Sequence, residues 1–560
     1  MARLRMLYSE EDAKSAYEGI ERLIAGYRKK ITSRDYYLNQ NDVILITYGD
    51  QVVRPGEEPL KTLKRFLDDH IKEVINTVHI LPFYPYSSDD GFSVIDYKDV
   101  SPRMGSWEDI EALREHYWLM FDGVINHVSQ YSFWFKSFLN NDPAYKDFFI
   151  EVDPVTDLSK VVRPRTSPLL HEFKDSEGKV RYIWTTFSKD QVDLNYHNYR
   201  VLLAVLDALL FYIEKGASLI RLDAIAFVWK EIGTPCIHLP QTHELIQLMR
   251  EVLHQVAPEV IIITETNVPH KENISYFGNG GDEAQMVYNF ALPPLIAHSI
   301  RVGDATVMRE WAKGLRLPSD KVCFFNFTAS HDGVGLRPVS ELLNKEEIDA
   351  LVEMVERRGG YVSYRATEEG SQSPYELNAS YIDIVSDPAE PNVERVRKMM
   401  LSQAVALAMP GVPGIYFHSL VGSTSDIEGV KRTGILRSIN REKLNYDLLI
   451  EEMQKSGSLR TMIYRSYKQL LSIRKRESSF HPYADFEIID SAPEFFVIRK
   501  YNDEKEELLA VHNFSNRPIL FLLPPFVQLP AMELIKNEPI EDEAILCDPY
   551  QVLWIKYKKG

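Results

Sequence analysis

Residues 218–224 read Ser218-Leu219-Ile220-Arg221-Leu222-Asp223-Ala224, a mostly apolar run that ends in charged residues. Such a run is typical of a strand that is buried on both faces of a parallel sheet. Three more segments place polar residues at the end of an apolar run: Asp122-Gly123-Val124-Ile125-Asn126-His127, Ile263-Thr264-Glu265-Thr266 and Ser330-His331-Asp332. Carboxylates, an arginine and histidines therefore recur in one structural position.

Strand-like runs and helix-like segments alternate along the chain. The runs cover residues 43–47, 77–81, 119–121, 218–222, 260–263, 286–288, 322–325 and 414–417. Amphipathic segments between them include 199–215, 243–256 and 392–408. This order predicts an α/β protein with a parallel sheet, and eight units favour a closed (β/α)8 TIM barrel. A doubly wound open sheet also fits the periodicity, although no Gly-x-Gly-x-x-Gly turn follows the first run.

Two long gaps and a change of pattern predict further parts. We expect an insertion subdomain after strand 3, a second insertion after strand 7 that overhangs the site, and a C-terminal β domain. The predicted parts are 1–128, an N-terminal helix and the first part of the barrel; 129–195, the insertion subdomain; 196–341, the barrel continuation with the catalytic residues; 342–391, the second insertion with acceptor loops; 392–478, the barrel end; and 479–560, the C-terminal β domain.

Composition limits the classes of function. The formal net charge of −17 argues against the phosphate backbone of nucleic acid as the main partner. Cys236, Cys323 and Cys547 are odd in number and far apart, which fits a reducing compartment and offers no metal-ligand spacing. The start lacks a signal-peptide core, and the apolar stretch 399–417 is interrupted by polar residues and prolines. We therefore expect a cytoplasmic protein without a membrane partner.

Asp223 and Glu265 follow successive predicted strands, and neighbouring strands lie about 5 Å apart. Cleavage of a glycosidic bond with retention needs two carboxyl groups at roughly this distance, one as nucleophile and one as acid. Arg221 lies two residues before Asp223 on the same face, so we expect it to keep the aspartate ionised. The apolar residues before Glu265 can raise its pKa towards that of a general acid. His331 and Asp332 add groups that could bind sugar hydroxyls.

Each of these features alone has a plainer explanation. An isolated Arg-x-Asp is more often a structural ion pair, a strand-end Glu is usually solvated, and His127 alone would be a structural histidine. Four polar segments at four strand ends are hard to explain as independent coincidences. Their convergence favours an active site at the carboxyl ends of the barrel strands.

Sequence motifs in a fixed order extend this interpretation. They are Asp90-Gly91-Phe92, residues 122–127, Gln191-Val192-Asp193-Leu194-Asn195, residues 216–224, Glu265, residues 330–335, residues 410–416 and Arg437-Ser438-Ile439-Asn440-Arg441. In this order and over essentially the whole chain, the sequence resembles the α-amylase superfamily of retaining α-glycosidases. Within it, the chain is similar to the sucrose-phosphorylase-like branch.

The resemblance implies Asp223 as nucleophile, Glu265 as acid/base and Asp332 as transition-state stabiliser. It further implies that a glucosyl ring is held by Asp90, Phe92, His127, Gln191, Arg221, His331 and Arg441. The implied reaction is phosphorolysis through a β-glucosyl-enzyme, with α-glucoside, inorganic phosphate and glucose 1-phosphate as the small-molecule partners. The resemblance implies neither a metal ion nor a cofactor.

Two positions depart from the sucrose phosphorylase pattern. Phe227 stands where that group carries tyrosine, and Asn267 stands where it carries histidine. These positions, with residues 88–97, 229–231 and 265–271, resemble the glucosylglycerate phosphorylases instead. The implied substrate is 2-O-α-D-glucosyl-D-glycerate. Phosphorolysis of sucrose, sucrose 6'-phosphate or glucosylglycerol stays open, as do a hydrolase and a non-catalytic sugar-binding barrel.

Phosphate and glycerate are both anions, so we expect cations near the acceptor. The family's pattern points to Arg163, Arg165 and Asn267 as phosphate or acceptor residues, and guanidinium groups offer forked donors to oxyanions. For the residue that reads the acceptor carboxylate, Tyr364-Arg365, Lys230 and the pair near Arg163 stay open.

Overall fold

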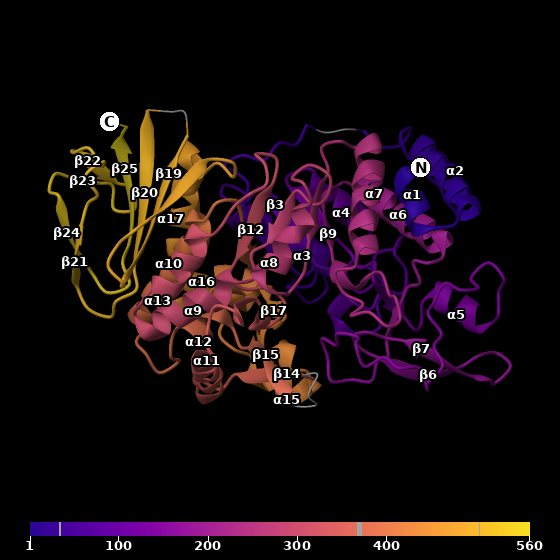
Figure 1. Ribbon diagram of the computed structural model, residues 1–560. Coiled ribbons are helices and arrows are strands. Elements are labelled where there is room, and N and C mark those ends of the chain that lie inside the picture. Colours follow the sequence, from indigo (N-terminus) through magenta and orange to yellow (C-terminus); the bar gives the residue numbers. More distant parts are fainter. Residues whose placement is uncertain (33–34, 367–371, 503–504, 560) are drawn as a thin grey trace.

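A closed barrel of eight parallel strands forms the centre of the computed structural model, which describes residues 1–32, 35–366, 372–502 and 505–559 (Figure 1). Each strand pairs with the next one of the barrel along the chain, and the last strand closes on the first. The strands are β1 Ile44–Thr47, β3 Thr77–Ile80, β4 Trp118–Gly123, β9 Ala217–Leu222, β10 Ile261–Thr264, β11 Met286–Tyr288, β12 Cys323–Phe327 and β16 Val412–Tyr416. All eight predicted runs are strands, so the barrel prediction is confirmed and the open-sheet alternative is wrong.

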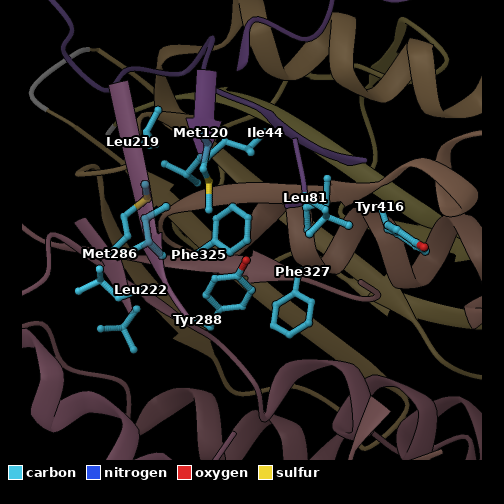
Figure 2. Close-up of a cluster of buried hydrophobic side chains, with 14 of the residues drawn as sticks. Ile44, Leu81, Met120, Leu219, Leu222, Met286, Tyr288, Phe325, Phe327 and Tyr416 are labelled. Atoms are coloured by element: carbon cyan, nitrogen blue, oxygen red, sulfur yellow. The ribbon is translucent and has the colours of Figure 1, made fainter. Parts of the chain in front are cut away.

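Large apolar side chains fill the barrel. Met120, Met286 and Phe325 come from three different strands, are fully buried and gather with Tyr288 in one cluster (Figure 2). The Arg221 guanidinium lies 5.6 Å from the Tyr288 ring, so the apolar filling meets charge towards the carboxyl ends of the strands. The barrel is therefore a packed core with a polar end, and this end holds the site.

Helices surround the barrel. The predicted segments form α6 Tyr199–Glu214, capped by Asn198, α7 Pro240–Val256, which begins with a proline, and α13 Asn392–Ala408. The other helices of these parts are α1 Ala2–Leu7, α2 Glu10–Tyr27, α3 Pro59–His70, α4 Trp107–Arg114, α8 His270–Asn273, α9 Leu292–Val302, α10 Thr306–Lys313, α14 Phe417–Leu420, α15 Ile427–Thr433, α16 Tyr446–Gln454 and α17 Leu459–Arg476. None of the helices in the described ranges is long and apolar enough to cross a bilayer.

The first insertion leaves the barrel after β4 and returns before α6. β5 His127–Ser129 pairs antiparallel with β8 Gln191–Asp193, which closes the insertion at its base. α5 Phe133–Leu139 and the hairpin of β6 Leu170–Lys174 and β7 Val180–Trp184 form its body, at the lower right of Figure 1. The loop before β6 carries Arg163 and Arg165.

The second insertion follows β12. β13 Val334–Gly335, β15 Gln372–Asn378 and β14 Tyr361–Ala366 form an antiparallel sheet, accompanied by α11 Lys345–Arg357 and α12 Tyr381–Val385. Residues 367–371, which belong to the loop predicted to overhang the site, lie outside the described residues. Two short helical turns, η4 Arg337–Val339 and η5 Leu436–Asn440, lie near this sheet and carry site residues.

A C-terminal region of antiparallel strands lies at the opposite end of the molecule from the first insertion (Figure 1). Its sheets contain β18 Asp485–Ile489, β19 Phe495–Tyr501, β20 Glu506–Asn513, β25 Val552–Lys558, β22 Ala531–Glu533 and β23 Glu538–Ile540, with β21 Ile519–Leu522 paired to β24 Ala544–Cys547. Phe496, Ile498 and Trp554 face the main core, whereas Val497 and Ile555 belong to a separate one. The limits of the six predicted parts stay a prediction.

Candidate active site

Two carboxylates stand next to each other at the ends of β9 and β10. Leu222 and Thr264, the last residues of these strands, are paired in register, and Asp223 and Glu265 follow them directly. The Glu265 N–H donates to the Leu222 carbonyl oxygen at 3.1 Å. Ala224 has a left-handed backbone with φ of 47°, and its N–H donates to Glu265 Oε2 at 3.0 Å. The turn after the aspartate therefore holds the neighbouring glutamate.

Arg221 joins both carboxylates. Its Nη1 donates to Asp223 Oδ1 at 2.9 Å, and its Nη2 lies 3.8 Å from Glu265 Oε2. Nη1 also donates to Asp122, which pairs with Arg221 in register on the adjacent strand and whose Oδ2 lies 2.7 Å from His79 Nε2. Asp122 was not predicted as a site residue, although its place at the end of a neighbouring strand was a usable signal.

Burial raises the pKa of Glu265 to about 7, with Arg221 opposing the shift and Asp223 and Asp332 adding to it. Burial likewise raises the pKa of Asp223 to about 7, because it and the carboxylates of Asp122 and Asp332 outweigh the ion pair with Arg221. The expected ion pair between Arg221 and Asp223 is present, and it opposes the effect of burial on the pKa of Asp223. Since Arg221 contacts Asp223 more closely than Glu265, we assign the charge to Asp223 and the proton to Glu265.

Asp332 is a third carboxylate of the site, and its charged form is favoured. Burial opposes its ionisation, but Arg437, His331 and Arg441 outweigh burial and lower its pKa below the usual range of an aspartate. Arg437 Nη1 pairs with Asp332 Oδ1, and His331 Nε2 lies 3.4 Å from Asp332 Oδ2. Arg437 also donates to Glu376 from Nε at 3.2 Å and from Nη2 at 2.5 Å. One guanidinium therefore ties the second insertion to the barrel.

The predicted sugar-binding residues meet on one side of the cavity. The Phe92 and His331 rings are stacked, with centroids 4.5 Å apart. His127 Nε2 lies 2.9 Å from the Phe92 carbonyl oxygen, and Gln191 Nε2 donates to the same oxygen at 3.1 Å. Arg441 Nε donates to the His331 carbonyl oxygen at 2.7 Å. The structure thus brings these five residues together.

A cavity opens between these residues and the paired carboxylates of Asp223 and Glu265. Asp89, which the sequence analysis did not single out, lines it, whereas the predicted residue Asp90 does not. Arg441 Nη1 lies 3.2 Å from carboxylate oxygens of both aspartates. Asp90, Arg221 and Arg441 do not line the cavity themselves. Arg221 pairs with Asp223 and Arg441 pairs with Asp89, and both of these aspartates line it.

On the other side of the cavity, the structure separates the two predicted arginines. Arg165 lines the cavity, with its guanidinium 5.4 Å from the Tyr375 ring and 3.9 Å from Glu376 Oε1. Arg163 does not line it, because its Nη2 donates to the backbone carbonyl oxygens of Thr166 and Ser167. Of the two arginines, Arg165 is therefore the one whose side chain lines the cavity.

Asn267 and Phe227 line this side as well, and Phe227 packs edge-on against Phe187. Lys230 does not line the cavity, because it is buried and its Nζ lies 2.6 Å from Asp193 and 2.7 Å from Asn126. Tyr364 and Arg365 do not line it either.

Tyr375, Glu376 and Arg337 do line the cavity and were missed. Nothing in their local sequence marked them. Arg437 also lines it, and only its position four residues before Arg441 offered a signal.

Known proteins are similar to this chain in sequence and fold. Residues 68–332 match the family described as the alpha amylase catalytic domain. The chain is 46% identical to a glucosylglycerate phosphorylase from Spirochaeta thermophila, covering 99% of this chain and 97% of the relative. It is 44% identical to the glucosylglycerate phosphorylase of Escherichia coli, covering 96% and 95%. The crystal structure of sucrose 6F-phosphate phosphorylase from Thermoanaerobacter thermosaccharolyticum has the same fold, with a TM-score of 0.75 at 24% identity over 90% of this chain and 98% of that one.

Proposed function

We propose that this chain, which belongs to the glucosylglycerate phosphorylase family of α-amylase-like enzymes, catalyses the reversible phosphorolysis of 2-O-α-D-glucosyl-D-glycerate. The products are α-D-glucose 1-phosphate and D-glycerate. The observation that carries the proposal is near-full-length similarity to two such phosphorylases, together with the paired carboxylates of Asp223 and Glu265. Adjacent strands lie roughly 5 Å apart, the carboxyl spacing of retaining enzymes.

In the first half-reaction, an Asp223 oxygen attacks the anomeric carbon. The bond to the glycerate oxygen breaks, and Glu265 gives its proton to this leaving oxygen. The assignment of the shared proton to Glu265 and the charge to Asp223 supports this direction. The result is a β-glucosyl-enzyme and free glycerate.

In the second half-reaction, a phosphate oxygen attacks the same carbon from the face that glycerate has left. The bond to Asp223 breaks, and ionised Glu265 accepts a proton from the phosphate. Two inversions give net retention, so the product is the α-anomer. Arg165 lines the cavity, and its nearest carboxylate oxygen, Glu376 Oε1, lies 3.9 Å away, beyond hydrogen-bond distance, so Arg165 is our candidate for holding the phosphate.

Asp332 stabilises the positive charge that develops on the sugar ring. Because Arg437, His331 and Arg441 keep it ionised, it stays anionic throughout the cycle. The glucosyl ring is oriented from the donor side by Phe92, His127, Gln191 and the neighbouring aspartates Asp89 and Asp90. We also place the protein in the cytoplasm, as its few free cysteines suggest.

The test is an assay of purified protein with glucosylglycerate in the presence and absence of inorganic phosphate. We expect glucose 1-phosphate to form only when phosphate is added. Equal release of glucose without phosphate would show a hydrolase and overturn the proposal. A donor panel with sucrose, sucrose 6'-phosphate and glucosylglycerol, assayed on the same preparation, decides between the neighbouring substrates.

A further inference from the structure

We infer that Arg337 binds the carboxylate of the glycerate acceptor and so determines acceptor specificity, an inference that rests on the proposed function. Arg337 opens η4, two residues after β13, and lines the active-site cavity. Its side chain is only 15% exposed. The nearest carboxylate is Glu272, with Oε2 3.7 Å from Arg337 Nη2. Within the described ranges, this guanidinium has no hydrogen-bond acceptor.

Other arginines of the site each donate to acceptors of the protein. Arg437 is shared between Asp332 and Glu376, and Arg441 between the His331 carbonyl oxygen and two aspartates. Arg163 donates to backbone carbonyls of its own loop. Arg337 and Arg165 differ from them, because both line the cavity with donors that no described residue accepts within hydrogen-bond distance.

An unsatisfied cation in this position costs free energy unless an anion joins it. Burial lowers the pKa of Arg337, Glu272 opposes the shift, and the nearby charge of Arg365 adds to it. Glu272 is 43% exposed and lies 3.1 Å from His238 Nε2, so solvent and a second partner weaken its compensation. An oxyanion bound in the cavity would supply the hydrogen-bond acceptors and the negative charge that the described residues do not provide for Arg337.

Arg337 stands on the side of the acid/base. Asn267 follows Glu265 by two residues, and the segment that leads to Arg337 packs against it: a Cβ on Gly335 would lie 2.5 Å from Asn267 Oδ1. This oxygen is itself buried without a hydrogen-bond partner in the described structure. Glu265 protonates the leaving oxygen of glycerate, so the rest of glycerate must lie beside it, between Asn267 and Arg337.

Two anions enter this cavity in turn, and two guanidinium groups are open to receive them. We have assigned Arg165 to phosphate, which leaves Arg337 for the carboxylate. A guanidinium binds a carboxylate with two parallel hydrogen bonds, a geometry that discriminates against neutral acceptors.

The experiment compares Arg337→Gln with wild type in the synthetic direction, with glucose 1-phosphate as donor and either D-glycerate or glycerol as acceptor. Glycerol replaces the carboxylate by a CH₂OH group. We expect kcat/KM for glycerate to fall by about 10–100-fold, the usual loss for a charged hydrogen bond. The value for glycerol should stay within about twofold, and KM for phosphate in phosphorolysis within about threefold.

Arg365→Gln is the matched control, since it removes the same charge from the same neighbourhood at a residue that does not line the cavity. It should leave the preference for glycerate over glycerol unchanged. Arg337→Lys keeps the positive charge but loses the two parallel donors of the guanidinium, so its preference for glycerate over glycerol should lie between those of wild type and Arg337→Gln. This variant also serves if thermal unfolding shows that Arg337→Gln is poorly folded.

Several results would overturn the inference. They are an unchanged glycerate preference in Arg337→Gln and Arg337→Lys, an equal loss for glycerate and glycerol, and a larger loss for phosphate than for glycerate. In each case wild type still uses glycerate, so the proposed function stands. A wild type that does not use glycerate would remove the proposed function and this inference together.

Discussion

The two sides of the active-site cavity treat positive charge differently. On the donor side, Arg221, Arg437 and Arg441 are each shared between carboxylates or carbonyl oxygens. On the acceptor side, the nearest carboxylate oxygen lies 3.9 Å from Arg165, on Glu376, and 3.7 Å from Arg337, on Glu272. Neither guanidinium has a hydrogen-bond acceptor within the described structure. The glucosyl ring is neutral and needs a balanced, fixed set of groups. Phosphate and glycerate bring their own charge, so their side is left unbalanced until they bind.

The largest effect is expected from Asp223→Asn, which removes the nucleophile from the donor side. Phosphorolysis should fall by at least roughly 10⁴-fold, because an amide cannot form the glucosyl-enzyme. Initial rates of glucose 1-phosphate release measure the effect. Asp349→Asn on the exposed face of α11 is the control and should behave as wild type. Undiminished activity of Asp223→Asn would contradict the assignment.

Glu265→Gln should lose about 10²–10⁴-fold with glucosylglycerate, because the leaving glycerate oxygen then receives no proton. Glucosyl fluoride, whose leaving group needs little protonation, should lose far less. Rates with the two donors on one preparation decide the matter. A similar loss with both donors would mean that Glu265 acts on the sugar and not on the acceptor. The division of the cavity into a donor side and an acceptor side would then not hold for Glu265.

The pH dependence follows from the pKa values of about 7 for Asp223 and Glu265. The active form needs Asp223 ionised and Glu265 protonated, so kcat/KM should form a bell centred near neutral pH. Above pH 7 the rate should fall about tenfold per pH unit as Glu265 loses its proton. Below pH 7 it should fall as Asp223 gains one. With glucosyl fluoride the alkaline fall should disappear, and its persistence would assign that limb to another group.

A smaller effect should separate the two arginines of the first insertion. Arg165→Gln should raise KM for phosphate by about 10–30-fold, since it removes a cation that lines the cavity and has no hydrogen-bond acceptor in the described structure. Arg163→Gln should change it by less than about threefold, because Arg163 is used by the carbonyls of Thr166 and Ser167. KM values for phosphate in phosphorolysis provide the measurement. An equal rise in both variants would mean that the loop as a whole binds phosphate.

The sequence by itself determined the barrel and its chemistry. Eight apolar runs alternate with helices, and parallel strands place their carboxyl ends at one edge, so residues such as Asp223 and Glu265 must come together. The spacing of Arg221 and Asp223 also fixed their shared face, because side chains alternate along a strand. Such local rules depend only on neighbouring residues and on strand register, which the pattern reveals.

Only the tertiary structure decided which residues complete the site. Arg337, Tyr375, Glu376 and Arg437 reach the cavity from segments whose course depends on long-range packing, and no local periodicity predicts it. Burial likewise outweighed the Arg221 ion pair in setting the pKa of Asp223. Whether a cation is already satisfied depends on acceptors far away in the chain. The chemistry of the donor side could therefore be predicted from the strand sequences. That Arg165 and Arg337 line the acceptor side without hydrogen-bond acceptors among the described residues follows only from the folded positions of the two insertions.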